Sequence, residues 1–382
     1  MRDLAAAVTV DSYVPAAGSA RRDAGVLLAI AVFMVLVGLL TVYSSSSFLA
    51  QSRGLPDHYF LRQQASKAMV GLLGLYVLAR IDYRVYARLA WPLLVAALFG
   101  LLLVVLPGTE SVAPTRNGAR RWLEFGIRVQ PSEMAKLAMV IWVAALAAKK
   151  GERVRSLRWG LAAFGIVYLL VAFLIMMQPD LSSAALIGLL CAIVLFAAGA
   201  RIGHFILLGL LAVPLLWEWI STASYRMARL ITFLDGGADP AGAGYQLNQS
   251  LIAVGSGGLF GVGYGESAQK YYFLPEPHND FAFAMFAEEW GWIGVLVLVA
   301  LVGLIGFLGL RIARRAPDAF GFLLAVGLTS LIVVSALIHM GVSVGLLPTT
   351  GITLPFISYG GSSLVVSLAA VGILLNIGSW RA

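Results

Sequence analysis

The chain has 382 residues, of which 60% are hydrophobic and 12% charged, and its formal net charge is +8. A soluble domain has about twice that charged fraction, so the composition excludes a soluble globular protein and indicates a polytopic membrane protein. The single cysteine, Cys191, excludes disulfides and cysteine metal sites, and the four histidines show no metal-ligand spacing. The positive charge lies mainly in short loops, which is typical of membrane topology rather than of nucleic-acid binding.

Ten apolar stretches are long enough to form membrane helices. In chain order we expect them at 24–47, 67–81, 89–106, 132–148, 158–177, 182–200, 203–220, 281–310, 319–342 and 355–378. Residues 1–22 are polar, and no short apolar region with a cleavage site follows them, so they are expected to form a cytoplasmic tail. The expected fold is one all-α membrane domain, residues 23–382.

The distribution of basic residues predicts the orientation. Most of the 27 lysines and arginines fall in loops on the same side as the N-terminus. The positive-inside rule therefore places both termini in the cytoplasm. Two long segments, 107–131 and 221–280, then lie outside the membrane. Loops of that length usually carry function or are disordered, and these two have glycines and aromatic residues rather than a disordered composition.

The first outer segment contains a basic cluster followed by tryptophan. Arg120 and Arg121 precede Trp122. Such a cluster suits an anionic lipid head group or a diphosphate. It also suits an interfacial aromatic belt with arginines that reach toward water, and both interpretations stay open.

Lys136 is the unusual residue of the next span. It lies about one turn inside an apolar helix, at the end where the helix dipole disfavours a cation. An ionisable residue at membrane depth is a functional hypothesis by default. Glu133 lies three residues earlier and shares its face, so a purely structural Glu133–Lys136 pair is the alternative.

Two further motifs favour structural roles. Asp180 in QPDLSSA is expected to cap the following helix. The glycines between 255 and 265 show no Walker pattern, and no strand precedes a helix there, which excludes a nucleotide site of that kind. We expect irregular backbone packed over a cavity, with residues 249–256 as a half-buried amphipathic element. Residues 345–363 are interrupted by proline and glycine, which membrane proteins tolerate only where the backbone is buried or lines a cavity.

The segment from Lys270 to Gly291 changes character at Asp280, from a proline-stiffened polar loop to an apolar helix. One interpretation is that Asp280 caps this helix, as aspartate does well. The other is that it is a catalytic carboxylate where a wet loop meets the membrane. A cap needs one polar residue and does not explain why Glu276 and His278 stand beside it.

Five stretches resemble the SEDS family (shape, elongation, division and sporulation), which includes FtsW and RodA. They are NGARRW…QPSEMAK, QPDLSSA, GYQLNQSLIAVGSGGLFG, LPEPHNDFAF…AEEWG and GLLPTTGITLPFISYGGSS. The last is more similar to FtsW than to RodA. The resemblance implies ten transmembrane helices in the bacterial cytoplasmic (inner) membrane. It also implies a peptidoglycan glycosyltransferase that polymerises lipid II on the outer face, for septal rather than elongation synthesis. A lipid II flippase is the alternative.

The resemblance also implies the site. The essential loop acid of the family falls on Asp280, the expected general base, and its QPSExxK motif falls on Glu133 and Lys136. Lys136, Arg120 and Arg121 are expected to stabilise the departing diphosphate. A divalent cation, Mg²⁺ or Mn²⁺, stays open, with Glu133 and Asp280 as its ligands, and no organic cofactor is expected. Substrate contacts are expected at Arg120, Arg121, Trp122, Lys270, Glu276, His278, Ser358 and Tyr359.

The expected partners are lipid II and undecaprenyl-diphosphate-linked glycan, a class B penicillin-binding transpeptidase and other divisome membrane proteins. The candidate surface for the transpeptidase is the eighth and ninth spans. The chain departs from the family pattern at a few positions: Asn279 where Thr or Ser is usual, Ser182 and Ser183 for a Gly-Thr pair, His339 and Ser343 where Asn is common, and Gly236 and Gly237 for Pro-Trp.

Overall fold

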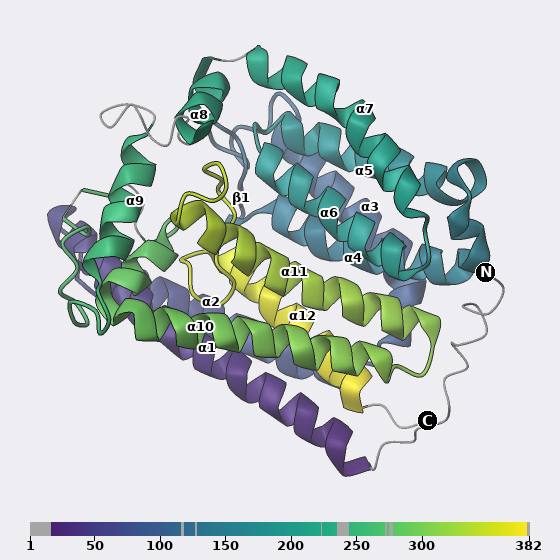
Figure 1. The fold of residues 1–382 in the computed structure, drawn as a ribbon, viewed down its shortest axis with the longest axis horizontal. Helices are drawn as coiled ribbons and strands as arrows, with labels where there is room; N and C mark the ends of the chain where they lie inside the picture. Colours follow the sequence, from purple (N-terminus) through teal and green to yellow (C-terminus); the bar gives the residue numbers. More distant parts are fainter. Residues whose placement is uncertain are drawn as a thin grey trace.

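A computed structural model describes residues 17–379 except 116–117, 127, 223, 235–243, 272 and 275–277. The expected all-α fold is confirmed: the described residues form a helical bundle with one short hairpin (Figure 1). Each predicted span coincides with a helix. The helices are α1 (Ala17–Ser52), α2 (Tyr59–Arg80), α3 (Arg84–Val105), α4 (Pro131–Lys150), α5 (Ala162–Met176), α6 (Leu181–Ala197), α7 (Ile202–Ser221), α10 (Ala282–Arg314), α11 (Ala319–Ser343) and α12 (Gly361–Ser379).

Length and apolarity qualify seven of the described helices as membrane spans, namely α1, α3, α4, α7, α10, α11 and α12. Helices α5 and α6 are apolar but shorter. Helix α2 begins at Tyr59, eight residues before the predicted span. The prediction missed its first turns because they carry polar residues, which a hydropathy pattern does not count. The fold therefore confirms the multi-pass membrane protein that the composition indicated.

The predicted start of the last span is wrong. The last helix begins at Gly361 rather than at residue 355, because Phe356 has a positive φ of 68°, which no residue of a right-handed α-helix adopts. Residues 351–360 are instead irregular, and Leu354, Phe356, Ile357 and Ser358 among them are buried. The fifth span opens with a π-helical turn at Leu157–Leu161 before α5.

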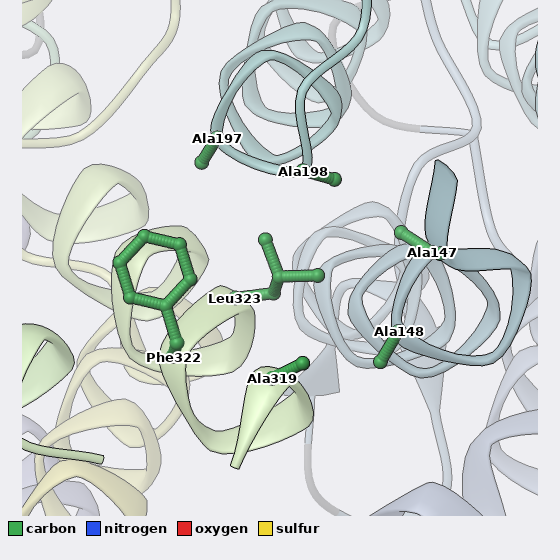
Figure 2. Close-up of a pocket in the computed structure, with 8 residues that line it drawn as sticks. Ala147, Ala148, Ala197, Ala198, Ala319, Phe322 and Leu323 are labelled. Carbon is green, nitrogen blue, oxygen red and sulfur yellow. The ribbon is translucent and has the colours of Figure 1, made fainter. Parts of the chain in front are cut away.

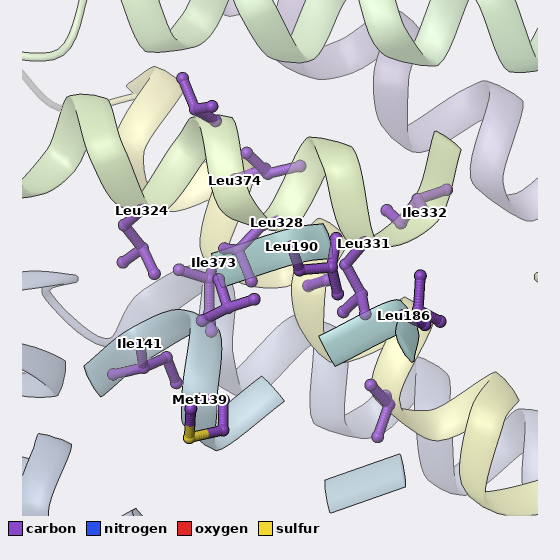
Figure 3. Close-up of a cluster of buried hydrophobic side chains, with 14 of the residues drawn as sticks. Met139, Ile141, Leu186, Leu190, Leu324, Leu328, Leu331, Ile332, Ile373 and Leu374 are labelled. Carbon is purple, nitrogen blue, oxygen red and sulfur yellow. The ribbon is translucent and has the colours of Figure 1, made fainter. Parts of the chain in front are cut away.

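The core of the bundle lies where α4, α6, α11 and α12 meet. Figure 3 shows Leu324 and Leu328 of α11 beside Ile373 and Leu374 of α12, and each is at most 1% exposed. Gly327 permits the close approach of α4, since a Cβ there would lie 2.5 Å from Val140 Cγ1. Small residues at such crossings are a general feature of packed membrane helices. The loops described below lie at one end of these packed helices.

Helix α7 lies at the edge of the bundle, along one side in Figure 1. None of the residues in its apolar window is buried, whereas 67% of the corresponding window of α11 is. Its apolar surface therefore faces outward on nearly all sides.

Both long segments that are predicted to lie outside the membrane contain structure that the sequence analysis did not place. Residues 107–131 include an antiparallel hairpin of β1 (Leu123–Glu124) and β2 (Arg128–Val129). Residues 221–280 include α8 (Ser224–Leu234) and α9 (Tyr245–Ser256). Residues 249–256, expected to be amphipathic and half-buried, form most of α9, which buries Leu247, Ser250 and Ala253.

The glycine-rich loop after α9 pairs with a break in α10. At Gly291 the helix backbone departs from helical geometry, with φ 64° and ψ −167°. The carbonyl oxygens of Glu288 and Glu289 accept from the N–H groups of Val262 and Gly263, at 2.9 and 3.3 Å. The N–H groups of Trp292 and Ile293 donate in turn to the carbonyl oxygens of Gly258 and Leu259, at 2.9 and 3.2 Å.

This exchange restores the hydrogen bonds that a broken membrane helix loses. It also explains the glycines: a Cβ at Gly261 would lie 2.0 Å from the Glu289 carbonyl oxygen, and one at Gly291 2.2 Å from the Gly261 nitrogen. The irregular backbone expected here is confirmed. What it packs on is the break in α10, rather than the cavity we expected.

Candidate functional site

The segment before α10 is clamped by the loop before α12. The Tyr359 N–H donates to the carbonyl oxygen of His278 at 2.8 Å, and the Ser358 hydroxyl donates to that of Asn279 at 3.0 Å. Ser358 also accepts the N–H of Leu354 at 2.9 Å, which folds the loop on itself. The two peptide units that precede Asp280 are therefore held by one buried loop.

Asp280 is not the cap of α10. The helix begins at Ala282, and its N-cap position is Phe281, whose φ of −129° and ψ of 29° are not helical. The capping interpretation of Asp280 is therefore wrong. The Asp280 side chain is half-buried. The other predicted cap is confirmed, because the Asp180 carboxylate accepts the N–H of Ser183 at 3.1 Å.

Glu133 and Lys136 form an ion pair inside the bundle. The Lys136 Nζ lies 2.6 Å from Glu133 Oε1, and their side chains are only 3% and 8% exposed. Helix α4 begins at Pro131, so this pair lies in its first two turns, as expected from the sequence. A buried pair of this kind holds a positive charge in place at the cost of its desolvation.

The start of α4 and the start of α10 are connected through α12. The N–H of Gln130, the residue before α4, donates to the Ser362 hydroxyl at 2.9 Å. Ser362 belongs to the first turn of α12, which directly follows the loop that clamps Asp280. Helices α2, α4, α10 and α12 all begin at this end, so the positive ends of their dipoles point to one region.

Arg120 and Arg121 are both engaged with nearby backbone. Arg120 donates to the carbonyl oxygen of Ala113 at 2.9 Å and to Glu110 at 3.1 Å. Arg121 donates to the carbonyl oxygens of Gln178 and Pro179, at 2.9 and 2.5 Å. The two arginines thus hold the segment before α4 to itself and to the turn between α5 and α6, and Trp122 beside them is half-buried.

His278 lies in an aromatic cluster with Phe60 and Tyr359. The centroid of the His278 ring is 5.3 Å from the centroid of each of the other two rings. It is 4% exposed, and burial, aided by the charge of Arg53, lowers its pKa to about 4. Burial likewise raises the pKa of Tyr359. The Tyr359 hydroxyl donates to Gln63 at 2.7 Å, so this cluster also holds α2.

One expected substrate contact, Lys270, stands apart from this arrangement. Lys270 donates to the carbonyl oxygen of Gly265 and lies over the Tyr271 ring, near the break in α10. Glu276 and the Gly236–Gly237 pair lie outside the described residues.

Two cations near the site were missed by the sequence analysis. Lys67 Nζ lies 4.6 Å from the centre of the Tyr359 ring. Arg128 is close enough to act electrostatically on both Lys67 and Tyr359. The available signal was the spacing of Gln63 and Lys67, four residues apart on one helical face.

The described residues do not form a metal site of their own. Among them no group of three or more acidic, histidine or cysteine side chains is placed to hold a metal ion. Glu133, one of the two expected ligands, is already bonded to Lys136. The side chains that the structure describes therefore do not by themselves make up a donor set for a cation.

The cavity in Figure 2 is remote from these groups. It has a volume of about 200 Å³ and lies between the C-terminal ends of α4 and α6 and the first turn of α11. Its lining side chains are Ala147, Ala148, Ala197, Ala198, Ala319, Phe322 and Leu323. No ionisable side chain lines it, so it offers no chemistry of the kind found around Asp280.

Comparisons with known proteins give a consistent result. The family model described as "Cell cycle protein", which covers FtsW, RodA and SpoVE, matches residues 25–381. The chain is 42% identical to stage V sporulation protein E of Bacillus subtilis over 92% of this chain and 95% of that protein. It is 41% identical to the "Probable peptidoglycan glycosyltransferase FtsW" of Geobacter metallireducens over 92% and 93%.

Solved structures agree in fold. One is described as "Structural coordination of polymerization and crosslinking by a peptidoglycan synthase complex". It matches with a TM-score of 0.76 and 30% identity, over 92% of this chain and 96% of that chain. The rod shape determining protein RodA of Thermus thermophilus matches with a TM-score of 0.67 and 29% identity, over 92% and 95%.

Proposed function

Because the chain belongs to the FtsW, RodA and SpoVE family of peptidoglycan glycosyltransferases, we propose that it polymerises lipid II on the outer face of the bacterial cytoplasmic membrane. The observation that carries this proposal is the placement of Asp280. It follows two clamped peptide units, stands one residue before the N-cap position of α10, and lies at the end of the bundle where α2, α4 and α12 also begin. That end also holds the buried charge of Lys136.

In this mechanism Asp280 is the general base. Its carboxylate takes the proton of the sugar 4-hydroxyl on the acceptor, and the oxygen attacks the anomeric carbon of the donor sugar. The new glycosidic bond forms as the bond from that carbon to the diphosphate oxygen breaks, so the configuration inverts. The electron pair of the broken bond leaves on undecaprenyl diphosphate.

Lys136 stabilises the departing diphosphate. Negative charge develops on the leaving oxygen as the bond breaks, and a fixed cation in a water-poor site stabilises it at no cost of reorganisation. Glu133 holds the ammonium group in place through the 2.6 Å contact. Arg120 and Arg121 position the outer segment beside it and offer their remaining N–H groups to the same anion. No step is assigned to a metal ion.

The cellular role we propose is septal wall synthesis, with both termini in the cytoplasm and residues 221–280 outside. The partner is a class B penicillin-binding transpeptidase, and a relative is described within a complex that couples polymerisation to crosslinking. The candidate surface is the outward face of α10, which exposes Trp292, Leu296 and Phe307. Co-purification with the cognate transpeptidase, lost on changing these three residues to alanine, tests this surface. Retained binding would count against it.

The activity is tested with purified protein and lipid II in detergent, with and without the cognate transpeptidase. Glycan strands should form, and more of them with the partner present. A lipid II flippase, the rival function, needs two membrane faces and would make no polymer in detergent. Absence of polymer from folded protein with its partner would contradict the proposal.

A further inference from the structure

The first turn of α12 has N–H groups without acceptors. Those of Gly361, Ser362 and Ser363 make no hydrogen bond within the described part of the chain, whereas Leu364 donates to Gly360 at 3.0 Å. The first N–H groups of any helix lack an intrahelical acceptor and lie at the positive end of its dipole. Here they are partly buried beside other positive groups, as described next.

Lys67 lies directly against this turn. A Cβ at Gly361 would lie 2.4 Å from Lys67 Cδ and 2.9 Å from Cε, so the glycine leaves room for the lysine side chain. The ammonium group stacks on Tyr359, yet it has no hydrogen-bond acceptor and no carboxylate partner among the residues that the structure describes. The cation–π contact explains where the side chain lies, but it leaves all three N–H donors unused.

Arg128 adds a second positive charge. It acts electrostatically on Lys67 and on Tyr359, and it forms an ion pair with Glu124 at 2.9 Å. Two cations and a helix N-terminus close together repel one another unless an anion lies between them. Phosphate groups are well suited to such a place, since they accept from backbone N–H groups and from cationic side chains together.

We infer that Lys67, Arg128 and the first turn of α12 form a second diphosphate site, which takes the diphosphate of the lipid-linked acceptor. This inference rests on the proposed function. The reaction joins two substrates that each carry a diphosphate, and Lys136 serves only the one that leaves. The loop that leads into α12 also clamps the segment before Asp280. The stretch that contributes the first turn of α12 to the acceptor's diphosphate site therefore also holds the separate segment that carries the base, Asp280.

A binding experiment tests the site without turnover. Native mass spectrometry of the detergent-purified protein with undecaprenyl diphosphate should show two bound copies for the wild type and one for Lys67→Met. Lys67→Arg keeps the charge and should bind two. Lys149→Met removes an exposed lysine at the other end of α4 and should also bind two. One copy on the wild type, or no loss in Lys67→Met, overturns the site. Arg128→Gln on the hairpin gives the same readout if Lys67→Met fails to fold.

Kinetics then identify the occupant. Lys67→Met should raise KM for lipid II by about ten- to a hundredfold, the range expected for a hydrogen bond to a charged group, with kcat within about twofold. An unchanged KM overturns the acceptor assignment. So does an equal loss of bound phosphatidylglycerol, which would make this a phospholipid site. If the wild type makes no polymer but Lys67→Met still loses one copy, the proposed function fails and the diphosphate site stands.

Discussion

His339 accepts the backbone N–H of Phe283 through Nε2, at 3.4 Å. Its Nδ1 lies 2.7 Å from the carbonyl oxygen of Ile352. A backbone N–H can only donate and a carbonyl oxygen can only accept, so these partners fix a neutral ring with its proton on Nδ1. The ring thus joins the first turn of α10 to the loop that clamps the residues before Asp280. The position of Asp280 is therefore set from both sides.

Replacing His339 should displace Asp280 indirectly, through the two backbone segments that His339 holds. His339→Leu leaves the Phe283 N–H and the Ile352 carbonyl group unpaired in a buried place, which costs about 1–3 kcal/mol each. We expect a lower thermal midpoint and slower polymerisation. His339→Gln keeps one donor and one acceptor and should recover part of both. Equal midpoints and rates for the leucine variant and the wild type would show that this bridge is unimportant.

The neutral state of His278 predicts a loss of stability in mild acid. Its pKa is about 4 in the folded protein against 6.5 for a free histidine. The unfolded chain therefore binds the proton first, and the stability that the neutral ring contributes is present above pH 6.5 and lost as the pH falls toward 4. The full effect is ~3 kcal/mol.

The control for this effect is His278→Phe, which keeps the aromatic contacts with Phe60 and Tyr359 but cannot titrate. Denaturation midpoints at pH 7.5, 6, 5 and 4.5 should fall more steeply for the wild type than for this variant. Parallel curves would mean that His278 does not supply the acid sensitivity.

The break in α10 depends on glycine. Gly291→Ala forces an alanine into a backbone region that side chains rarely adopt and places a Cβ 2.2 Å from the Gly261 nitrogen. The strain alone costs about 1–3 kcal/mol, and the clash adds to it. We expect poor thermal stability. The matched control on the same helix is Gly303→Ala, whose Cβ meets nothing within 4 Å and should be tolerated. Similar behaviour of the two variants would contradict this role of the break.

Lys136→Met tests whether the charge of Lys136 is catalytic or only part of a structural pair with Glu133. Methionine keeps nearly the same volume, but Glu133 loses its partner and polymerisation should become undetectable. Glu133→Gln combined with Lys136→Met removes the unpaired carboxylate and should restore stability without restoring activity, because the diphosphate still lacks its cation. The measurements are the thermal midpoint and the rate of lipid II consumption. Recovered activity in the double variant would reduce the pair to a structural role.

The sequence predicts the helices well and their connections poorly. Apolar runs placed all ten spans, because membrane burial dominates the choice of structure there. The hydropathy pattern did not indicate the start of α2, because its first turns carry polar residues such as Gln63 and Lys67. It also did not indicate the irregular backbone at Phe356. The pairing of the glycine-rich loop with α10 joins residues about 30 apart through backbone atoms, which leave no side-chain pattern in the sequence.

The candidate site was predictable only where one residue carried the signal. Lys136 is an ionisable group in an apolar run, and Asp280 stands at a change of character in the chain, so both were found. Lys67 was not found, because its importance comes from Gly361 and Tyr359, nearly 300 residues away. His339 was noticed as an unusual residue, but its role needed the Phe283 and Ile352 contacts.

The most direct test of the catalytic assignment is the rate of lipid II polymerisation by Asp280→Asn, with its thermal midpoint measured alongside. Asparagine keeps the size of the side chain but cannot take the proton, and loss of general-base catalysis alone slows a reaction roughly 10²- to 10⁴-fold. We predict a midpoint close to that of the wild type and no detectable polymer in a gel assay. Asp280→Glu should keep at most weak activity, since displacement of the carboxylate by about 1 Å can cost 10²-fold. A stable Asp280→Asn protein that makes long glycan strands at the wild-type rate would contradict the assignment of Asp280 as the base.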